Sequence, residues 1–313
     1  MLSKGCDDAS TVPELPDVSV YAESLAAKLG GSLLRRIRIV NPFLLRTAVP
    51  PINAAEGRSV HGVERLGKRV VIVLQGDVPG DPAQDWFLVL HLMIAGRLHW
   101  YAAGAKPPAK GAQAFFEFDA GTLVFTEAGT QRRASLHLVA GREALAAMDP
   151  GGLEVMQASQ AEFDARLLAG KHTLQRALTA PQAFSGIGNS YSDEILHRAR
   201  LSPVTLTTAL SADERVRLFN ATREVLTEWT ERLRAEAARS GGWPKSVTAF
   251  RPEMAVHGRF GQPCPVCDAP VQRIVYASNE TNYCARCQTG GKLLADRALS
   301  RLLKASWPKT LDD

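Results

Sequence analysis

The chain has 313 residues, of which 45% are hydrophobic and 22% are charged, with 37 basic side chains against 32 acidic ones. This length and apolar content exclude a disordered chain and predict two domains plus a smaller module. The N-terminus has no apolar stretch behind a basic start, and no window approaches the length of a membrane span, so we predict a cytoplasmic protein. The net charge of +5 permits an anionic partner without requiring one.

The chain begins with a polar leader, residues 1–12, which we expect to be disordered or not translated. A helix is predicted after it, because Pro13-Glu14-Leu15-Pro16-Asp17 is typical of a helix entry and Gly30-Gly31 of a helix end. Apolar or small side chains recur between them at helical spacing, at Val18, Tyr21, Leu25 and Leu29. This periodicity predicts a buried first helix.

Residues 33–138 have the composition of a sheet sandwich. Short β-rich runs cover 70–74, 87–90 and 123–126, and loops rich in Gly and Pro separate them, notably 76–85 and 102–111. We therefore place a β-sandwich domain at 13–140.

Beyond Gly151-Gly152 the pattern becomes helical. Helices are predicted over 160–169, 174–180, 189–198 and from about 211 to 239. The last begins with the capping-box pattern Ser211-x-x-Glu214. Its apolar side is formed by Leu218, Val225, Trp229 and Leu233. We assign 150–245 to a helical domain.

Two Cys-x-x-Cys pairs, Cys264/Cys267 and Cys284/Cys287, are separated by sixteen residues. Four thiolates at this spacing can occupy the corners of one tetrahedron, which is the closed coordination of a structural zinc ion. Four ordinary buried cysteines or two disulfides are the alternative, but the turn-like context of both pairs and the reducing cytoplasm favour the metal. We predict one structural Zn²⁺ in a zinc finger over 250–290.

The zinc finger and the tail after it carry local positive charge. Between His257 and Lys304, seven basic side chains stand against three acidic ones. A basic zinc module usually faces phosphate. The tail, 291–313, is predicted to contain a short amphipathic helix over 292–304.

Three segments carry a resemblance to a known family. They are Pro13–Val18, the run Gly186–Leu196 with its Gly-Ile-Gly-Asn turn, and Val256-His257-Gly258-Arg259 leading into Cys264. Together they resemble the formamidopyrimidine-DNA glycosylase and endonuclease VIII family of base-excision repair enzymes, as a divergent bacterial member. The resemblance implies an α+β fold with an N-terminal helix, a two-layer β-sandwich, a helix-two-turn-helix domain and a four-cysteine zinc finger. It further implies a monomeric DNA glycosylase and abasic-site lyase, without a membrane partner, that clasps damaged double-stranded DNA between its halves in the nucleoid.

The resemblance assigns catalytic roles to Pro13, Glu14 and Lys68. In the family the chain begins at a proline, whose secondary amine attacks C1′ of the damaged nucleotide and forms a Schiff base that permits β-elimination of the phosphate. Pro13 matches that proline, and Glu14 matches the glutamate that transfers protons at the sugar. Lys68 matches the lysine that holds the phosphate beside the lesion. Without the resemblance, the opening motif is a helix-entry turn and Lys68 is a solvated cation.

The resemblance also implies a set of DNA contacts. Asn189 matches the asparagine that binds a backbone phosphate at a helix N-terminus, and an ordinary helix cap is the alternative. Ile94, or its neighbour Met93, matches the residue that fills the gap left by a flipped base. The remaining DNA-binding candidates are Arg132 and Arg133 at the orphan base, Asn279 at the zinc fingertip, and Lys171.

Two features depart from the family pattern. Pro13 lies inside the chain, where its nitrogen is a tertiary amide that cannot form a Schiff base; translation from a GTG codon at Val12, followed by methionine removal, would expose it. Asn279 stands where the family commonly has an arginine, which predicts weakened δ-elimination. The rival to the lyase is a non-catalytic binder of damaged DNA on the same scaffold. A zinc-ribbon protein of transcription or translation would leave the other two motifs unexplained.

Overall fold

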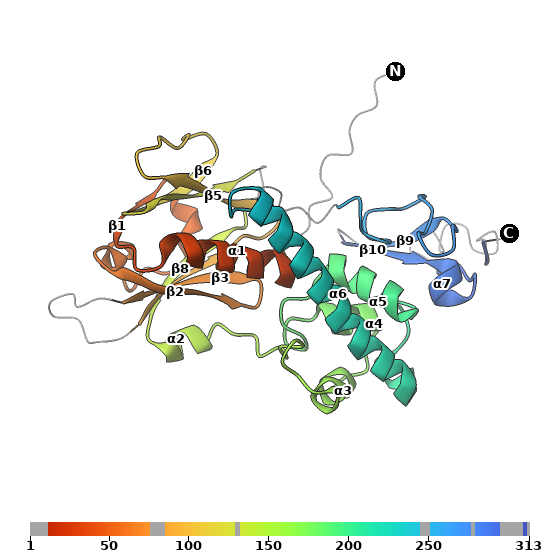
Figure 1. Cartoon of the computed structure of the whole chain (residues 1–313). Helices are drawn as coiled ribbons and strands as arrows, with labels where there is room; N and C mark the ends of the chain where they lie inside the picture. Colours follow the sequence, from red (N-terminus) through yellow and green to blue (C-terminus); the bar gives the residue numbers. More distant parts are fainter. Residues whose placement is uncertain are drawn as a thin grey trace, which may run out of the picture. The chain divides into compact units, whose positions relative to one another are not determined.

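The computed structural model describes residues 12–75, 85–128, 132–244, 251–276, 279–294 and 309–311. The chain forms two compact units (Figure 1). The β unit combines Val12–Pro150 with Trp229–Val247, and the helical unit combines Gly151–Glu228 with Thr248–Asp313. The helix α6 (Ala212–Arg239) is continuous through this boundary, so its first part belongs to the helical unit and its last part to the β unit.

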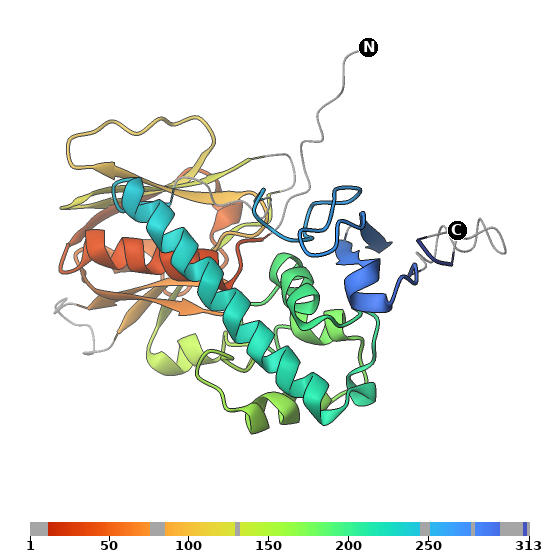
Figure 2. The ribbon, with the colours of Figure 1, turned by 45° about the vertical axis from the view of Figure 1, so that its right-hand side comes forward.

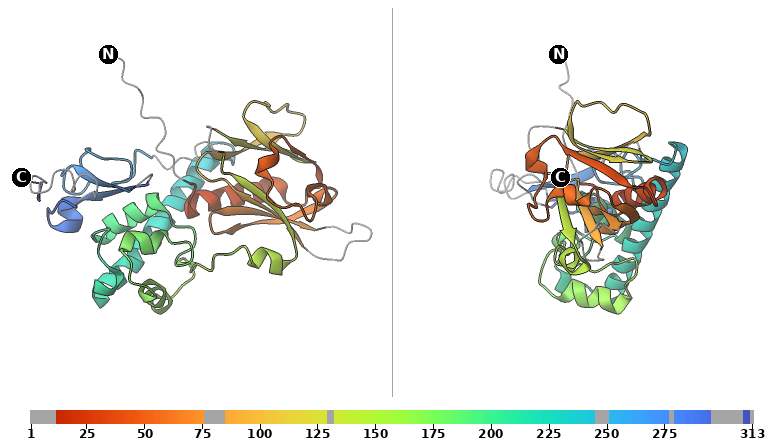
Figure 3. Two further views of the ribbon diagram at one scale, coloured as in Figure 1. Left: turned by 180° about the vertical axis from the view of Figure 1, so that it is seen from behind. Right: turned by 90° about the vertical axis from the view of Figure 1, so that its left-hand side faces the viewer.

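The β unit contains two antiparallel four-stranded sheets that lie face to face (Figure 3). The first sheet, in the order β1-β6-β7-β5, consists of β1 (Leu34–Ile39), β5 (Gly96–Ala102), β6 (Ala112–Phe118) and β7 (Gly121–Glu127). The second, in the order β2-β3-β4-β8, consists of β2 (Ser59–Leu66), β3 (Arg69–Gln75), β4 (Trp86–His91) and β8 (Ser135–Ala140). Two 3-10 turns, η1 (Pro42–Leu44) and η2 (Ile52–Ala55), lie between β1 and β2.

The apolar run of β3 is buried on both faces. Val70 and Ile72 belong to the core between the sheets, which also takes in α1 (Leu15–Leu29). Val71 and Val73 lie on the opposite face, in a cluster with Leu145 of α2 (Arg142–Ala146). Successive side chains of a strand alternate between faces, so an uninterrupted apolar sequence is what a strand covered on both sides requires.

The last part of α6 packs against α1 within the β unit. Val20 forms an apolar cluster with Leu233 and Ala237. The guanidinium of Arg234 makes two hydrogen bonds, of 2.8 and 2.7 Å, to the carboxylate of Glu23. The C-terminal part of α6 is therefore packed into the unit that is otherwise formed by the N-terminal half of the sequence.

The helical unit contains α3 (Gln160–Leu168), α4 (Leu174–Thr179), α5 (Asn189–Ala199), the 3-10 turn η3 (Thr207–Ala209) and the first part of α6. The predicted capping box of α6 is confirmed: the N–H of Ser211 donates to the carboxylate of Glu214 at 2.9 Å, and the N–H of Glu214 donates to the Ser211 hydroxyl at 3.2 Å. In the core, the ring of Phe163 lies 4.9 Å from that of Phe184 and 5.3 Å from that of Phe219.

The zinc module belongs to the helical unit. The strands β9 (Val271–Tyr276) and β10 (Asn279–Cys284) pair as an antiparallel hairpin, and α7 (Ala285–Thr289) follows directly. β10 lies beside α5 (Figure 2). β10 ends at Cys284, so the hairpin brings one of the four cysteine positions next to the helix that begins with Asn189.

The predicted first helix and the four predicted helices of the helical domain are confirmed as α1, α3, α4, α5 and α6, and the three β-rich runs lie in β3, β4 and β7. α2 and α7 were not predicted, because five residues are too few to show a helical period. The leader, most of the loop 76–85 and most of the predicted tail helix lie outside the described residues. Lys292, at the start of that predicted helix, instead pairs with Thr310 in an isolated β-bridge. Within the described ranges, no helix combines the length and the apolarity needed to cross a bilayer.

Candidate nucleic-acid interface and metal centre

One end of the β2-β3-β4-β8 sheet brings together residues that are far apart in the sequence. Lys68 occupies the two-residue turn between β2 and β3, after Gly67 with a φ of 60°. Next to this turn, Arg69 pairs with His91, the last residue of β4, and His91 pairs with Ser135, the first residue of β8. The loop after β4 and the segment before β8 therefore lie at the same end of the sheet as Lys68.

The loop between β4 and β5 holds Ile94 in a defined turn. Met93 has a left-handed backbone, with a φ of 50°, which is uncommon for a residue with a side chain. The guanidinium of Arg97 donates to the carbonyl of Ile94 at 3.0 Å, and the N–H of Gly96 donates to the carbonyl of Leu92 at 2.9 Å. Hydrogen bonds to the backbone therefore define this turn. A defined turn is what the role implied for Ile94 requires, because a side chain that fills the gap left by a flipped base must be held in position.

Arg132 and Arg133 emerge from a segment that a buried carboxylate holds. Glu127, the last residue of β7, is 4% exposed and accepts hydrogen bonds from the N–H groups of Arg133 at 2.7 Å and Ala134 at 2.8 Å. Both arginines are exposed. A backbone hydrogen bond of 3.3 Å donated by Ala128 joins this part of the chain to the β4–β5 loop.

Pro13 and Glu14 stand at the start of α1 and are buried. The N–H of Glu14 donates to the carboxylate of Asp17 at 3.1 Å, as part of a capping box. The opposite end of α1 adjoins the first residues of β2, where the N–H of Gly31 donates to the carbonyl of Val60 at 3.0 Å. Since β2 starts at that end and leads to the Lys68 turn at the other, α1 runs along the sheet with Pro13 and Glu14 directed toward the Lys68 end.

Tyr21 ties the first half of α1 to the start of β5. It is 1% exposed, and its hydroxyl is hydrogen-bonded to the backbone of Leu98. Burial raises the pKa of Tyr21, while the positive charge of Arg97 opposes that shift. Arg97 also donates to the Ile94 carbonyl, so the same charge that acts on Tyr21 of α1 helps to define the β4–β5 loop.

His91 is a candidate site residue that the sequence interpretation missed. Burial lowers the pKa of His91 to about 4, and the positive charges of Arg69 and Lys68 act in the same direction. The imidazole is therefore neutral near pH 7 and offers an N–H beside the ammonium group of Lys68. A histidine that ends an apolar strand directly before a loop was the signal that could have identified it.

In the helical unit, Asn189 is the first residue of α5. Its side-chain oxygen accepts a hydrogen bond from Nε2 of Gln175 in α4 at 3.1 Å. The bond orients the amide of Asn189 at the N-terminus of a helix, where the helix dipole favours an anion. Gln175 was missed, since a glutamine inside a short helix gives no functional pattern. Lys171 is exposed just before α4 and forms no ion pair with any described residue.

Two buried carboxylates of α5 hold the zinc module. Glu194 accepts hydrogen bonds from three consecutive backbone N–H groups, those of residues 255–257, at 2.7, 2.9 and 2.9 Å. Asp193 accepts the N–H of Asn282 at 2.9 Å, and its other contact places it 2.8 Å from Nδ1 of His257. Burial raises the pKa of Asp193 to about 7, although these contacts oppose the shift. The helix that begins with Asn189 and the zinc module are thus joined by buried hydrogen bonds.

The four cysteines form one cluster. Their Sγ atoms all lie within 4.8 Å of one another, with separations of 3.4 Å for Cys267–Cys284 and Cys267–Cys287 and 3.9 Å for Cys264–Cys287. Zinc–sulfur bonds of about 2.3 Å place tetrahedral sulfurs roughly 3.8 Å apart. Burial raises the pKa of the Cys284 thiol to about 11, so a bound metal ion is what would keep that sulfur a thiolate at neutral pH. Nε2 of His197 lies 3.3 Å from Sγ of Cys264 and can donate a hydrogen bond to that ligand.

The fingertip is the turn of the β9–β10 hairpin. Asn279 pairs with Tyr276 next to this turn, and its side chain is not among those described. The neighbouring Glu280 lies 3.2 Å from the guanidinium of Arg273. The acidic charge beside the fingertip is therefore paired within the hairpin.

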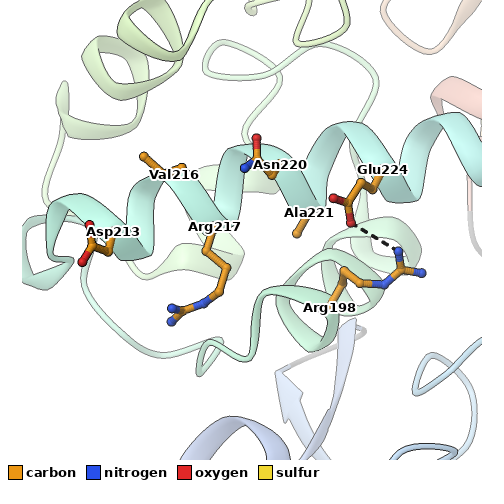
Figure 4. Close-up of a pocket in the computed structure, with 7 residues that line it drawn as sticks. All are labelled: Arg198, Asp213, Val216, Arg217, Asn220, Ala221 and Glu224. Carbon is orange, nitrogen blue, oxygen red and sulfur yellow. Dashed lines mark hydrogen bonds and ion pairs between the residues drawn. The ribbon is translucent and has the colours of Figure 1, made fainter.

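A surface pocket opens between α5 and α6 (Figure 4). It is lined by Arg198, Asp213, Val216, Arg217, Asn220, Ala221 and Glu224. Arg198 lies 2.7 Å from Glu228 and 3.5 Å from Glu224, and Arg217 donates to the carbonyl of Ala199 at 2.7 Å. Both arginines of the pocket therefore already have partners within the protein, and none of the predicted site residues lines this pocket.

Comparison with protein families agrees with this arrangement along most of the chain. Residues 12–134 match the formamidopyrimidine-DNA glycosylase N-terminal domain, 148–237 match the formamidopyrimidine-DNA glycosylase H2TH domain, and 261–290 match the zinc finger found in FPG and IleRS. The chain belongs to the formamidopyrimidine-DNA glycosylase family. Membership assigns it to the DNA glycosylases of base-excision repair, in which abasic-site lyase activity is characteristic.

Relatives from this family match over their full length. A formamidopyrimidine-DNA glycosylase of Roseiflexus sp. (strain RS-1) is 34% identical over 286 residues, covering 88% of this chain and 100% of the relative. A formamidopyrimidine-DNA glycosylase of Thermus thermophilus is 32% identical over 303 residues, which cover 90% of this chain and 100% of the relative. An uncharacterized formamidopyrimidine-DNA glycosylase-like protein of Mycobacterium tuberculosis is 38% identical over 167 residues, covering 53% and 100%.

Solved structures of the family share the fold. Lactococcus lactis Fpg in complex with DNA containing an abasic site superposes with a TM-score of 0.75 at 23% identity, covering 88% of this chain and 99% of that one. MutM in complex with DNA containing carbocyclic 8-oxo-G superposes with a TM-score of 0.74 at 23% identity, covering 88% of this chain and 100% of that one. The predicted α+β fold is confirmed. So is the structural zinc site, on which the zinc-finger match and the four-cysteine cluster agree.

Proposed function

We propose that this chain excises oxidised or ring-opened bases from damaged duplex DNA and then cleaves the abasic strand by β-elimination, acting as a monomer on the DNA of the bacterial cytoplasm. The observation that carries the proposal is the convergence of separate segments on one end of the β-sandwich. These are the start of α1 with Pro13 and Glu14, the Lys68 turn, the β4–β5 loop with Ile94, and the segment with Arg132 and Arg133.

The chemistry requires an amine with a free electron pair. The nitrogen of Pro13 attacks C1′, the bond from C1′ to the damaged base breaks, and the base leaves with a proton. Opening of the sugar ring gives an iminium ion between the proline nitrogen and C1′. Loss of a proton from C2′ then expels the 3′-phosphate and leaves a double bond in the sugar. We assign the transfer of these protons to Glu14, and two observations support the assignment: it adjoins Pro13 in the sequence and is 2% exposed.

The phosphate beside the lesion is assigned to Lys68 and His91. Lys68 supplies the charge, and the neutral imidazole of His91 supplies an N–H without adding a second cation. In the helical unit, Asn189, with Lys171 before α4, is assigned to a further backbone phosphate. Asn279 brings no charge to the fingertip, so β-elimination is expected to outpace δ-elimination.

The alternative function is binding of damaged DNA without chemistry. It follows for any form of the chain in which Val12 stays attached to Pro13, because an amide nitrogen cannot form an iminium ion. Such a protein would keep the basic surfaces and lose the nucleophile.

Borohydride trapping on abasic duplex DNA separates the two functions. Protein purified from its native gene is first weighed intact, which establishes whether Pro13 is its first residue. A chain with a free Pro13 should form a reduced covalent adduct, and a matched chain that retains Val12 should form none. A free Pro13 that yields no adduct, in protein that binds the same DNA with steep salt dependence, would refute the lyase and support the binder.

A further inference from the structure

The outer face of the β2-β3-β4-β8 sheet becomes basic toward the Lys68 end. Directly paired residues of neighbouring strands point to the same side, so Arg69 and His91 share a face. His137 shares it too, because it pairs with Val89, two residues before His91. Val89 belongs to the apolar cluster that includes Leu145 of α2. The polar part of this face therefore begins where the apolar cluster ends.

Arg46 adds a further cation beside His137. The N–H of Arg46 donates to the carbonyl of Leu136 at 2.9 Å, and Leu45 forms a parallel bridge with Leu136. Burial lowers the pKa of His137, and the charges of Arg69 and Arg46 lower it further. We call the resulting row of adjacent groups the basic strip, consisting of Lys68, Arg69, His91, His137 and Arg46.

The two ends of the basic strip have no ion-pair partner among the described residues. Arg46 is exposed, Lys68 is half-buried, and neither forms an ion pair with a described residue. Arg69 donates to the carbonyl of Met148 at 2.8 Å, and Asp149 is the acidic group that acts on it. An extended anion that lies across the strip would meet a cation at each end and neutral N–H donors between them.

We propose that the basic strip is a second contact for the DNA backbone, running from Lys68 across His91 and His137 to Arg46. The inference rests on the proposed function, in which Lys68 binds the phosphate beside the lesion. The row crosses three strand spacings, roughly 14 Å at about 4.8 Å each. Neighbouring phosphates of one strand lie farther apart than the axial rise of about 3.4 Å, because the strand also winds around the axis, so Arg46 would reach the backbone within about four nucleotides of the lesion.

The salt dependence of binding tests the strip. Affinity is measured at about 50 to 200 mM KCl on a long duplex that carries a tetrahydrofuran abasic analogue. One lost phosphate contact reduces the slope of log Kd against log [KCl] by about 0.9, or roughly 3.5-fold in affinity across this range. Arg46→Gln should show this loss and Arg46→Lys should not. Arg36→Gln is the matched control, since Arg36 is exposed on β1 of the other sheet and carries the same charge; its slope should equal that of the wild type.

A gain-of-contact variant and a short duplex make the test independent of how well Arg46→Gln folds. His137→Lys should raise the slope by about 0.9 on the long duplex. Both variants should match the wild type on a duplex that ends about one nucleotide from the analogue on that side, because this duplex lacks the phosphates that the far end of the strip would contact. An unchanged slope for Arg46→Gln and His137→Lys, or an equal loss for Arg36→Gln, would overturn the strip. Borohydride trapping of wild-type protein reports separately on the proposed function, so an adduct combined with unchanged slopes rejects the strip alone.

Discussion

Replacing Glu194 by alanine should weaken the attachment of the zinc module to α5. The carboxylate is 6% exposed and accepts three backbone hydrogen bonds from residues 255–257. Val256 and His257 are buried, so their N–H groups would lose their acceptor where water does not replace it, whereas Ala255 is half-buried and can be rehydrated in part. At about 1–3 kcal/mol for each unsatisfied buried donor, the loss is roughly 3–5 kcal/mol. That is a large fraction of the ~5–15 kcal/mol that stabilises a typical domain.

Two measurements check this expectation. Thermal unfolding followed by circular dichroism gives the loss of stability, and a chromophoric chelator gives the rate of zinc release. Glu194→Gln keeps one acceptor oxygen and should lose less than the alanine variant. Glu280→Gln is the control, because its exposed ion pair with Arg273 is worth about 0–1 kcal/mol. A Glu194→Ala protein that unfolds within about 1 kcal/mol of the wild type and releases zinc at the same rate would refute the reasoning.

Three further predictions concern the loop, the buried acid and the metal. Gly96→Ala should destabilise the β4–β5 loop by about 1–3 kcal/mol, because the added Cβ would overlap the carbonyl oxygen of Leu92. Gly62→Ala is the control: its Cβ meets no atom within 4 Å, so its stability, measured by calorimetry, should be close to that of the wild type. Asp193→Asn should flatten the pH dependence of the free energy of unfolding. The pKa of Asp193 is raised from 3.8 to about 7 in the folded protein, so its carboxyl group stabilises the fold fully below the unfolded pKa, and this stabilisation is lost as the pH rises toward 7. Urea titrations at several pH values in which variant and wild type run parallel would contradict this. Chelation of zinc should remove hydrogen-exchange protection from β9 and β10, and Zn²⁺ but not Mg²⁺ should restore it; protection that survives without metal would count against a structural ion.

The features that could be predicted from the sequence are those whose signals are local. α1 and α6 repeat their apolar residues over several turns, and the cysteine spacing alone contains the tetrahedral ligand set. The family motifs likewise lie at two helix starts, Pro13 just before α1 and Asn189 at the first residue of α5, while the roles of both residues stay predictions.

The missed features depend on neighbours that only the fold supplies. His91 becomes a candidate because β-pairing sets it beside Arg69 and close to Lys68, and its pKa falls for the same reason. Asp193 and His257 are 64 residues apart, so no periodic pattern could connect them. Burial and charge are properties of the three-dimensional surroundings, and the sequence contains them only through the completed fold.

The buried carboxylate of Glu127 accepts hydrogen bonds from the main-chain N–H groups of Arg133 and Ala134. Every residue except proline supplies such an N–H, whatever its side chain. This anchoring of the segment is consequently independent of which residues occupy positions 132 and 133. In the proposed function these two positions face the orphan base, so substitutions there would change what is recognised opposite the lesion while the backbone support from Glu127 stays constant.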